Sequence, residues 1–224
     1  FRRDGHWNQW GRIVAAADVA PGERVVEIGP GLGSLTLGLI EAGTSVTAVE
    51  IDRRLAALLP ETVAAMGAPE GALEVVAADA MDVDELPGDP TALVANLPYE
   101  SATPMVRAFA RRRDLFSRLV VMVQREVAER ICSRPGEDGY GFLSVDVAFH
   151  AKARRLFDVP PGDFTPRPKV GATVVELVPF APPDEAAAAI AVASAGFAVR
   201  RKTLTNALGA VWGREAAAAA VAGA

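Results

Sequence analysis

The chain has 224 residues, half of them apolar, and a formal net charge of −5 at pH 7. This length suits one full α/β domain with a small appendage better than two equal domains. The acidic balance does not by itself favour nucleic-acid binding, although binding depends on where the basic residues lie.

Cysteine content and hydropathy set further limits. Cys132 is the only cysteine, so neither an intrachain disulfide nor a thiolate metal cluster can form. The apolar run 186–199 is too short and too rich in alanine to cross a bilayer comfortably. The first ten residues are too charged for the core of a signal peptide. We therefore expect a cytoplasmic monomer with no metal and no membrane partner.

From Arg24 onward, short β-branched runs alternate with helical stretches, which is typical of βαβ units and a largely parallel sheet. The predicted strands are 24–28, 45–50, 74–77, 92–95 and 119–123, and the predicted helices are 34–41, 53–66, 104–112 and 124–132. The apolar spacing of segment 140–150 fits neither the helical nor the strand period. Strands 154–159 and 173–178, joined by the proline-rich loop 160–170, predict an antiparallel pair at a sheet edge.

The last part of the chain differs in composition. After the linker Phe180-Ala181-Pro182-Pro183, segment 184–224 is rich in alanine and has a high helix propensity. We therefore predict two domains, a catalytic domain over 1–180 and a small helical domain over 181–224.

A glycine-rich loop, Glu27-Ile28-Gly29-Pro30-Gly31-Leu32-Gly33, follows the first predicted strand. Glycines permit a tight turn and a close approach of ligand to backbone. The spacing is G-x-G-x-G and not the G-x-G-x-x-G of nicotinamide enzymes. Glu27 would repel a pyrophosphate but suits a ligand that carries positive charge, such as S-adenosylmethionine with its ammonium and sulfonium groups.

Acidic residues stand at or near the ends of the next two strands. Glu50 lies about twenty residues beyond the loop, where a carboxylate can accept hydrogen bonds from both ribose hydroxyls. Asp79 can accept a hydrogen bond from an adenine amino group, and Ala78 and Ala80 leave room for a flat ring. Asp82 and Asp84 follow closely in the sequence, so it stays open which of the three aspartates takes this position.

The most specific signal is the tetrapeptide Asn96-Leu97-Pro98-Tyr99 after the fourth strand. The asparagine oxygen and a backbone carbonyl can accept two hydrogen bonds from one amino group, while Tyr99 offers a stacking face worth about 1–3 kcal/mol. The delocalised lone pair of an adenine amine is a poor nucleophile, so positioning and electrostatics can supply the catalysis. A simple strand-terminating turn would explain the proline but not the whole tetrapeptide.

Six segments together resemble the ribosomal RNA adenine N6,N6-dimethyltransferases, which include the small-subunit (kasugamycin-sensitivity) enzymes and the erythromycin-resistance methyltransferases. They are VVEIGPGLGSLT (25–36), VTAVEID (46–52), NLPYESATP (96–104), MVQREVAER (122–130), YGFLSV (140–145) and FDVPPGDFTPRPKV (157–170). The resemblance implies a Rossmann-like class I methyltransferase fold, in the α/β class, with a seven-stranded, mostly parallel sheet and a small C-terminal helical domain.

The resemblance also assigns roles to residues. It implies S-adenosylmethionine as the cofactor, with contacts at Glu27, Gly29, Gly31, Glu50, Ile51, Asp79, Ala80 and Asn96. The catalytic set it implies is Asn96, Leu97, Pro98, Tyr99 and Phe164, with Tyr99 and Phe164 flanking the target adenine. Phe164 comes from the resemblance alone, because by itself it reads as core packing.

The implied target is a pair of adjacent adenines in a hairpin loop of small-subunit ribosomal RNA, each methylated twice in connection with ribosome assembly. Such bases must leave their stack to reach a pocket. Leu97 and the segment VQREVAER favour the small-subunit branch over the resistance branch. One departure is Glu100, because the family usually has asparagine after the tyrosine.

Basic residues cluster at two places where we expect contacts to RNA phosphates. They are Arg111, Arg112, Arg113, Arg200, Arg201 and Lys202. On charge alone, solvated surface faces explain these clusters equally well.

Four other functions remain open at this stage: a large-subunit enzyme conferring macrolide resistance, a nicotinamide-dependent oxidoreductase, a DNA adenine methyltransferase and a non-catalytic ribosome-assembly factor. The G-x-G-x-G spacing argues against the oxidoreductase, and the segments after residue 120 argue against a DNA target. Glu100 keeps the assembly factor in consideration.

Overall fold

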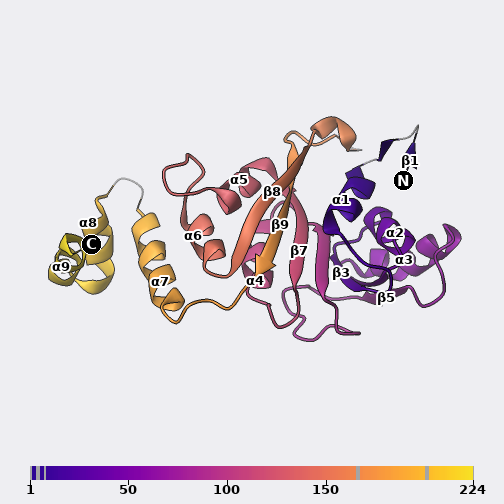
Figure 1. The fold of residues 1–224 in the computed structure, drawn as a ribbon, viewed down its shortest axis with the longest axis horizontal. Helices are drawn as coiled ribbons and strands as arrows, with labels where there is room; N and C mark the ends of the chain where they lie inside the picture. Colours follow the sequence, from indigo (N-terminus) through magenta and orange to yellow (C-terminus); the bar gives the residue numbers. More distant parts are fainter. Residues whose placement is uncertain (1, 4–5, 8, 165–166, 200–201, 224) are drawn as a thin grey trace.

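A seven-stranded sheet runs through the protein, in the strand order β5-β4-β3-β6-β7-β9-β8. The computed structural model describes residues 2–3, 6–7, 9–164, 167–199 and 202–223 (Figure 1). The sheet strands are β3 (Arg24–Ile28), β4 (Ser45–Val49), β5 (Leu73–Val76), β6 (Ala92–Asn96), β7 (Arg118–Gln124), β8 (Ala151–Val159) and β9 (Ala172–Pro179). A small hairpin, β1 (Arg2–Arg3) with β2 (His6–Trp7), precedes it.

The first five sheet strands are parallel to their neighbours, and the last two are paired antiparallel. β9 pairs antiparallel with β7, and β8 pairs antiparallel with β9. The sheet is therefore mostly parallel with a reversed strand near one edge, which confirms the predicted sheet and its antiparallel pair.

Both faces of the sheet are covered by helices, which explains why the central strands β6 and β7 read as nearly continuous apolar runs. In β7, Leu119, Val121 and Val123 belong to one buried cluster, whereas Val120 and Met122 belong to the other. The first cluster includes residues of α4 (Ala102–Phe109), α5 (Arg125–Cys132) and α6 (Phe142–Ala148). The second includes residues of α1 (Gln9–Ala17), α2 (Ser34–Glu41) and α3 (Arg53–Ala65).

Two helices go beyond the sequence-based expectation. The pattern did not predict α1, and segment 140–150, which fitted neither period, contains α6. α6 has only seven residues, so it shows less than two full turns of helical periodicity. Predicted boundaries elsewhere agree to within a few residues; for example, α4 ends at Phe109 and not at Arg112.

Three further helices follow the linker: α7 (Ala186–Phe197), α8 (Leu204–Trp212) and α9 (Arg214–Ala222). They extend beyond the sheet at one end of the molecule (Figure 1). Their buried residues Ala186, Ala207, Leu208 and Ala217 belong to neither core cluster of the sheet. The domain boundary at residues 180–181 stays a prediction. Within the described ranges, no helix is both long and apolar enough to span a membrane.

Candidate functional site

The loops that follow the parallel strands β3 to β7 emerge at one edge of the sheet. Ile28 is level with Val49, Val49 with Val76, and Asn96 with Met122. In a doubly wound sheet, ligands bind beyond this carboxyl edge of the strands. The predicted residues of the glycine loop, Glu50, Asp79 and Asn96 therefore surround one region.

The three glycines of the first loop have different roles. All have positive φ, at +67° for Gly29, +56° for Gly31 and +85° for Gly33. A β-carbon on Gly33 would lie 2.8 Å from Leu59 Cδ1, so this glycine allows α3 to pack closely. A β-carbon on Gly31 would meet no atom within 4 Å, so Gly31 borders open space. The loop thus packs against the protein at Gly33 and leaves room for a ligand at Gly31.

Glu50 connects the glycine loop to the start of α3. The Gly31 N–H donates to its Oε2 at 3.1 Å, and the Asp52 N–H donates to its Oε1 at 3.0 Å. The Glu50 side chain is buried, and Asp52 caps α3 by accepting from the Arg54 N–H at 2.8 Å. Since each carboxylate oxygen can accept a second hydrogen bond, Glu50 retains capacity for hydroxyl donors.

Glu27 lies beneath the same loop and is fully buried. The Thr36 hydroxyl donates to its Oε2 at 2.6 Å, and the Thr36 backbone N–H also donates to the carboxylate. Desolvation by burial, together with the nearby charge of Glu50, raises the pKa of Glu27 to about 8 against the lowering effect of the two Thr36 hydrogen bonds. A cationic ligand at the loop would favour the ionised carboxylate. Sequence reasoning gave no role to Thr36, although this residue ends the matching segment 25–36.

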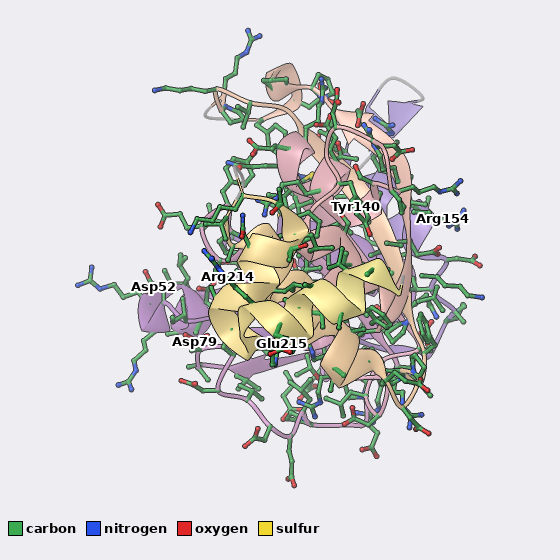
Figure 2. All side chains as sticks on the ribbon, turned by 90° about the vertical axis from the view of Figure 1, so that its left-hand side faces the viewer. Asp52, Asp79, Tyr140, Arg154, Arg214 and Glu215 are labelled. Carbon is green, nitrogen blue, oxygen red and sulfur yellow. The ribbon has the colours of Figure 1, made fainter. Side chains whose placement is uncertain are left out.

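Asp79 and Ala80 lie in the loop after β5, which ends three residues earlier at Val76. The Asp79 Oδ1 accepts from the Met81 N–H at 2.9 Å, and Ala80 is buried. Ile51, after β4, is an apolar side chain with 68% of its surface exposed. Figure 2 shows Asp52 and Asp79 toward the same margin of the molecule, as expected for loops that follow the paired strands β4 and β5.

The tetrapeptide begins at the last residue of β6. Leu97 is buried and its N–H donates to the Met122 carbonyl at 3.1 Å, which fixes the turn against β7. Pro98 lies next to the glycine loop, because a β-carbon on Gly29 would lie 3.9 Å from its Cγ and Cδ. Tyr99 is half-buried, and burial raises the pKa of its hydroxyl. The tetrapeptide and the glycine loop therefore lie next to each other at the carboxyl edge of the sheet.

The Asn96 amide is half-buried, and among the described residues no side-chain hydrogen bond engages it. An amide oxygen with free lone pairs at a ligand-binding edge can accept a hydrogen bond from an amino group. Glu100 is exposed and follows directly after Tyr99.

Phe164 follows the short 3₁₀ helix η1 (Pro161–Asp163) in the loop between β8 and β9. Its side chain is half-buried and packs against the cluster that contains residues of α1–α3. The Gln9 side chain holds this loop by donating to the Asp163 carbonyl at 2.7 Å. The strand ends beside it, Gln124 of β7 and Ala172 of β9, are paired, so the loop emerges at the same edge as Asn96.

The predicted phosphate-binding residues fall into different environments. Arg111 and Arg107 both form ion pairs with the buried Asp146, and Arg112 forms an ion pair with Asp114. Arg113 and Lys202 are exposed and form no ion pair with another described residue. Arg200 and Arg201 lie outside the described residues.

Two solved structures of RNA-modifying transferases are similar to this chain in fold. A dimethyladenosine transferase from Plasmodium falciparum superimposes with a TM-score of 0.74 and 27% identity, over 91% of this chain and 74% of its own. The 23S rRNA methyltransferase ErmE superimposes with a TM-score of 0.72 and 25% identity, over 98% and 87%. The sheet order and these neighbours define a Rossmann-like class I methyltransferase fold, as the sequence predicted.

The family model described as ribosomal RNA adenine dimethylase matches residues 8–222. Two relatives, each named ribosomal RNA small subunit methyltransferase A, support the match. The protein from Kineococcus radiotolerans is 49% identical over 92% of this chain and 70% of its own. The one from Thermobifida fusca is 50% identical over 93% and 74%. This chain belongs to the ribosomal RNA adenine dimethylase family.

Proposed function

We propose that the protein transfers methyl groups from S-adenosylmethionine to the N6 amino group of adjacent adenines in small-subunit ribosomal RNA, in the cytoplasm and in connection with ribosome assembly. The observation that carries the proposal is the Asn96 side-chain amide, which forms no hydrogen bond with another described residue and ends β6 at the carboxyl edge of the sheet. The turn that follows it adjoins the glycine loop through Pro98 and Gly29. The relatives named above support the choice of small-subunit RNA.

The residues at this edge fit S-adenosylmethionine. The open space at Gly31 admits a ligand, the buried Glu50 carboxylate can accept from ribose hydroxyls, and Glu27 supplies negative charge to a cationic ligand. Asp79 with Ala80 and the exposed Ile51 are proposed to hold the adenine ring. When bound, the cofactor supplies an electrophilic methyl group on a sulfonium.

The tetrapeptide is proposed to hold the target base. The Asn96 amide oxygen and the Leu97 carbonyl accept hydrogen bonds from the N–H groups of the adenine amine. This arrangement favours a tetrahedral nitrogen, whose lone pair is directed out of the ring plane. Tyr99 stacks on the base, and Phe164 is proposed to cover its other face. Fixing the base in this orientation supplies the catalysis by positioning and electrostatics.

The test is transfer of labelled methyl from S-adenosylmethionine to unmethylated small subunits, with large-subunit RNA compared in parallel. We expect label in small-subunit RNA, recovered as N6,N6-dimethyladenine. Asn96→Ala should lower the rate by about 10²-fold or more, the usual cost of removing one catalytic hydrogen-bonding group. Asn206→Ala, on the exposed surface of α8, is the matched control and should leave the rate unchanged.

Two outcomes would overturn parts of the proposal. Label confined to large-subunit RNA would assign the protein to the resistance branch. Absence of label from both RNAs, with S-adenosylmethionine still binding, would favour a non-catalytic assembly factor.

A further inference from the structure

A cleft lies between α5, the segment that joins α5 to α6, and the end of α7. Its volume is about 740 Å³, which is within the range of ligand-binding pockets. Figure 1 shows the α5–α6 segment facing α7 at the junction of the sheet with the C-terminal helices. The cleft brings together residues that lie far apart in the sequence, so no local motif predicts it.

One wall of the cleft is aromatic. The rings of Tyr140 and Phe197 pack edge to face, with their centroids 6.0 Å apart and an interplanar angle of 70°. Phe142 also lines the cleft, and Phe197 is 40% exposed. In Figure 2, Tyr140 lies behind the C-terminal helices. Exposed aromatic rings in a cleft are suited to stacking on a flat ligand, and base stacking of this kind tolerates any nucleobase.

Carboxylates also line the cleft. Glu126 and Glu129 lie three residues apart on the exposed side of α5, and Asp138 lies nearby in the cleft. Among the described residues, none of these three forms an ion pair. Carboxylates repel phosphate but accept hydrogen bonds from amino groups on base edges, as they do from the N4 amine of cytosine. The cleft therefore favours the edge of an amino-bearing base over a phosphate.

Glu126 and Glu129 also border a second, smaller cavity of about 310 Å³. Its other residues include Gln124 at the end of β7, Arg125 at the start of α5 and Gly171 just before β9. β7 pairs with β6 here, with Asn96 level with Met122. Glu126 and Glu129 thus connect the cleft with the edge of the sheet that carries Asn96.

We propose that the cleft holds an unpaired nucleobase with an exocyclic amino group, namely the neighbour of the base in the catalytic pocket. This inference rests on the proposed function. The aromatic wall stacks on the base, Glu126 or Glu129 accepts from its amino group, and Arg130 and Lys202 at the cleft contact the adjoining phosphates. A substrate with two adjacent target bases is thereby held with one base in the catalytic pocket and the other in the cleft.

The test uses an RNA hairpin with 2-aminopurine, a base whose fluorescence falls on stacking, next to the target adenine. We expect the full-length protein to quench the probe and Phe197→Ala to remove most of that quenching. Tyr140→Ala should do the same and Tyr140→Phe should retain the quenching, which separates loss of stacking from loss of folding. Val211→Ala, an exposed apolar residue of α8 outside the cleft, is the control.

A second arm tests base preference. Replacing the neighbouring adenine by uracil should weaken binding about tenfold, and the double variant Glu126→Gln with Glu129→Gln should reduce that difference. If the protein methylates the hairpin but the Phe197→Ala variant still quenches the probe fully, the cleft proposal alone is overturned. A hairpin that is bound and not methylated would instead overturn the proposed function.

Discussion

Glu27 is a buried carboxyl whose ionisation depends on its surroundings. Burial raises its pKa to about 8, whereas the pKa of an exposed glutamate is 4.5. Near neutral pH, the side chain of the ligand-free protein is therefore largely protonated. The unfolded chain releases this proton at a lower pH. Between the two pKa values, the folded state therefore binds one proton more than the unfolded state.

This difference predicts how stability changes with pH. The contribution of Glu27 is fully present below about pH 4.5 and is lost as pH rises toward 8. Glu27→Gln keeps a neutral side chain at all pH values, so its Tm relative to that of the unchanged protein should rise from pH 5 to pH 8. Thermal melts of the ligand-free proteins measure this. A difference that is independent of pH would contradict the protonated state, and Glu185→Gln, on the surface, serves as control.

Gly33 and Gly31 form a second comparison at single residues. Gly33→Ala places a β-carbon 2.8 Å from Leu59 and 3.2 Å from Val63 at a positive φ, whereas Gly31→Ala meets the same kind of backbone strain in open space. We expect Gly33→Ala to cost about 2–4 kcal/mol, as strain plus overpacking, and Gly31→Ala about 1–2 kcal/mol. Urea unfolding curves give both values. Equal losses would show that packing against α3 is not the limiting contact.

At the scale of elements, Asp146 joins α6 to α4. Its side chain is fully buried and forms ion pairs with Arg107 and Arg111, whose side chains are 38% and 36% exposed. The Arg107 guanidinium also lies 5.1 Å from the centroid of the Phe142 ring. These contacts fix α6, whose following segment leads to the edge strand β8.

Removing the Asp146 charge should therefore loosen this helix pair. Asp146→Asn leaves two arginines without their partner, and we expect a loss of about 2–4 kcal/mol in the free energy of unfolding, because both arginine heads still reach water. Asp114→Asn breaks the exposed pair with Arg112 and should cost less than about 1 kcal/mol. Denaturant titration distinguishes them, and similar losses would argue against a special role for the buried pair.

The elements differed in how well the sequence predicted them. The β3–β7 strands were found because each is a short, largely apolar run that alternates with a helical stretch, and β8 and β9 because a proline-rich loop separates them. α1 was missed because it has no acidic residue in its first turn and no basic residue in its last. The partners of Asp146 could not be predicted, because Arg107 and Arg111 lie 39 and 35 residues away.

At the scale of the whole molecule, the distribution of free cations matters more than the net charge. Arg111 and Arg112 are already engaged with acids of the protein, whereas Arg113 is exposed and forms no ion pair with another described residue. Of the three predicted arginines that follow α4, Arg113 is therefore the residue best placed to contact phosphate.

RNA binding at several salt concentrations tests this assignment. Arg113→Gln should lower the slope of log affinity against log salt by about 0.7–0.9, the share of one phosphate contact. The control is Arg154→Gln on the edge strand β8, which should leave the slope unchanged because the Arg154 side chain pairs with Glu176 of β9. An unaltered slope in Arg113→Gln would place the RNA elsewhere on the surface.

The candidate site was predictable only in part. The ends of successive parallel strands must meet at one edge, so Glu50, Asp79 and Asn96 could be grouped from strand order alone. The Tyr140–Phe197 contact could not, because it joins a loop to a helix from a separate part of the chain. Such a contact has no spacing that a sequence pattern can reveal.

The two outer strands of the sheet also bear on how the protein behaves in concentrated solution. β8 carries Lys152, Arg154 and Arg155, and its register with β9 is shifted between Arg155 and Phe157. Arg154 projects at the margin of the molecule in Figure 2. At the other edge, β5 has only four residues. Charged, irregular or short borders are poor templates for a foreign strand, so this sheet is protected against growing into intermolecular aggregates.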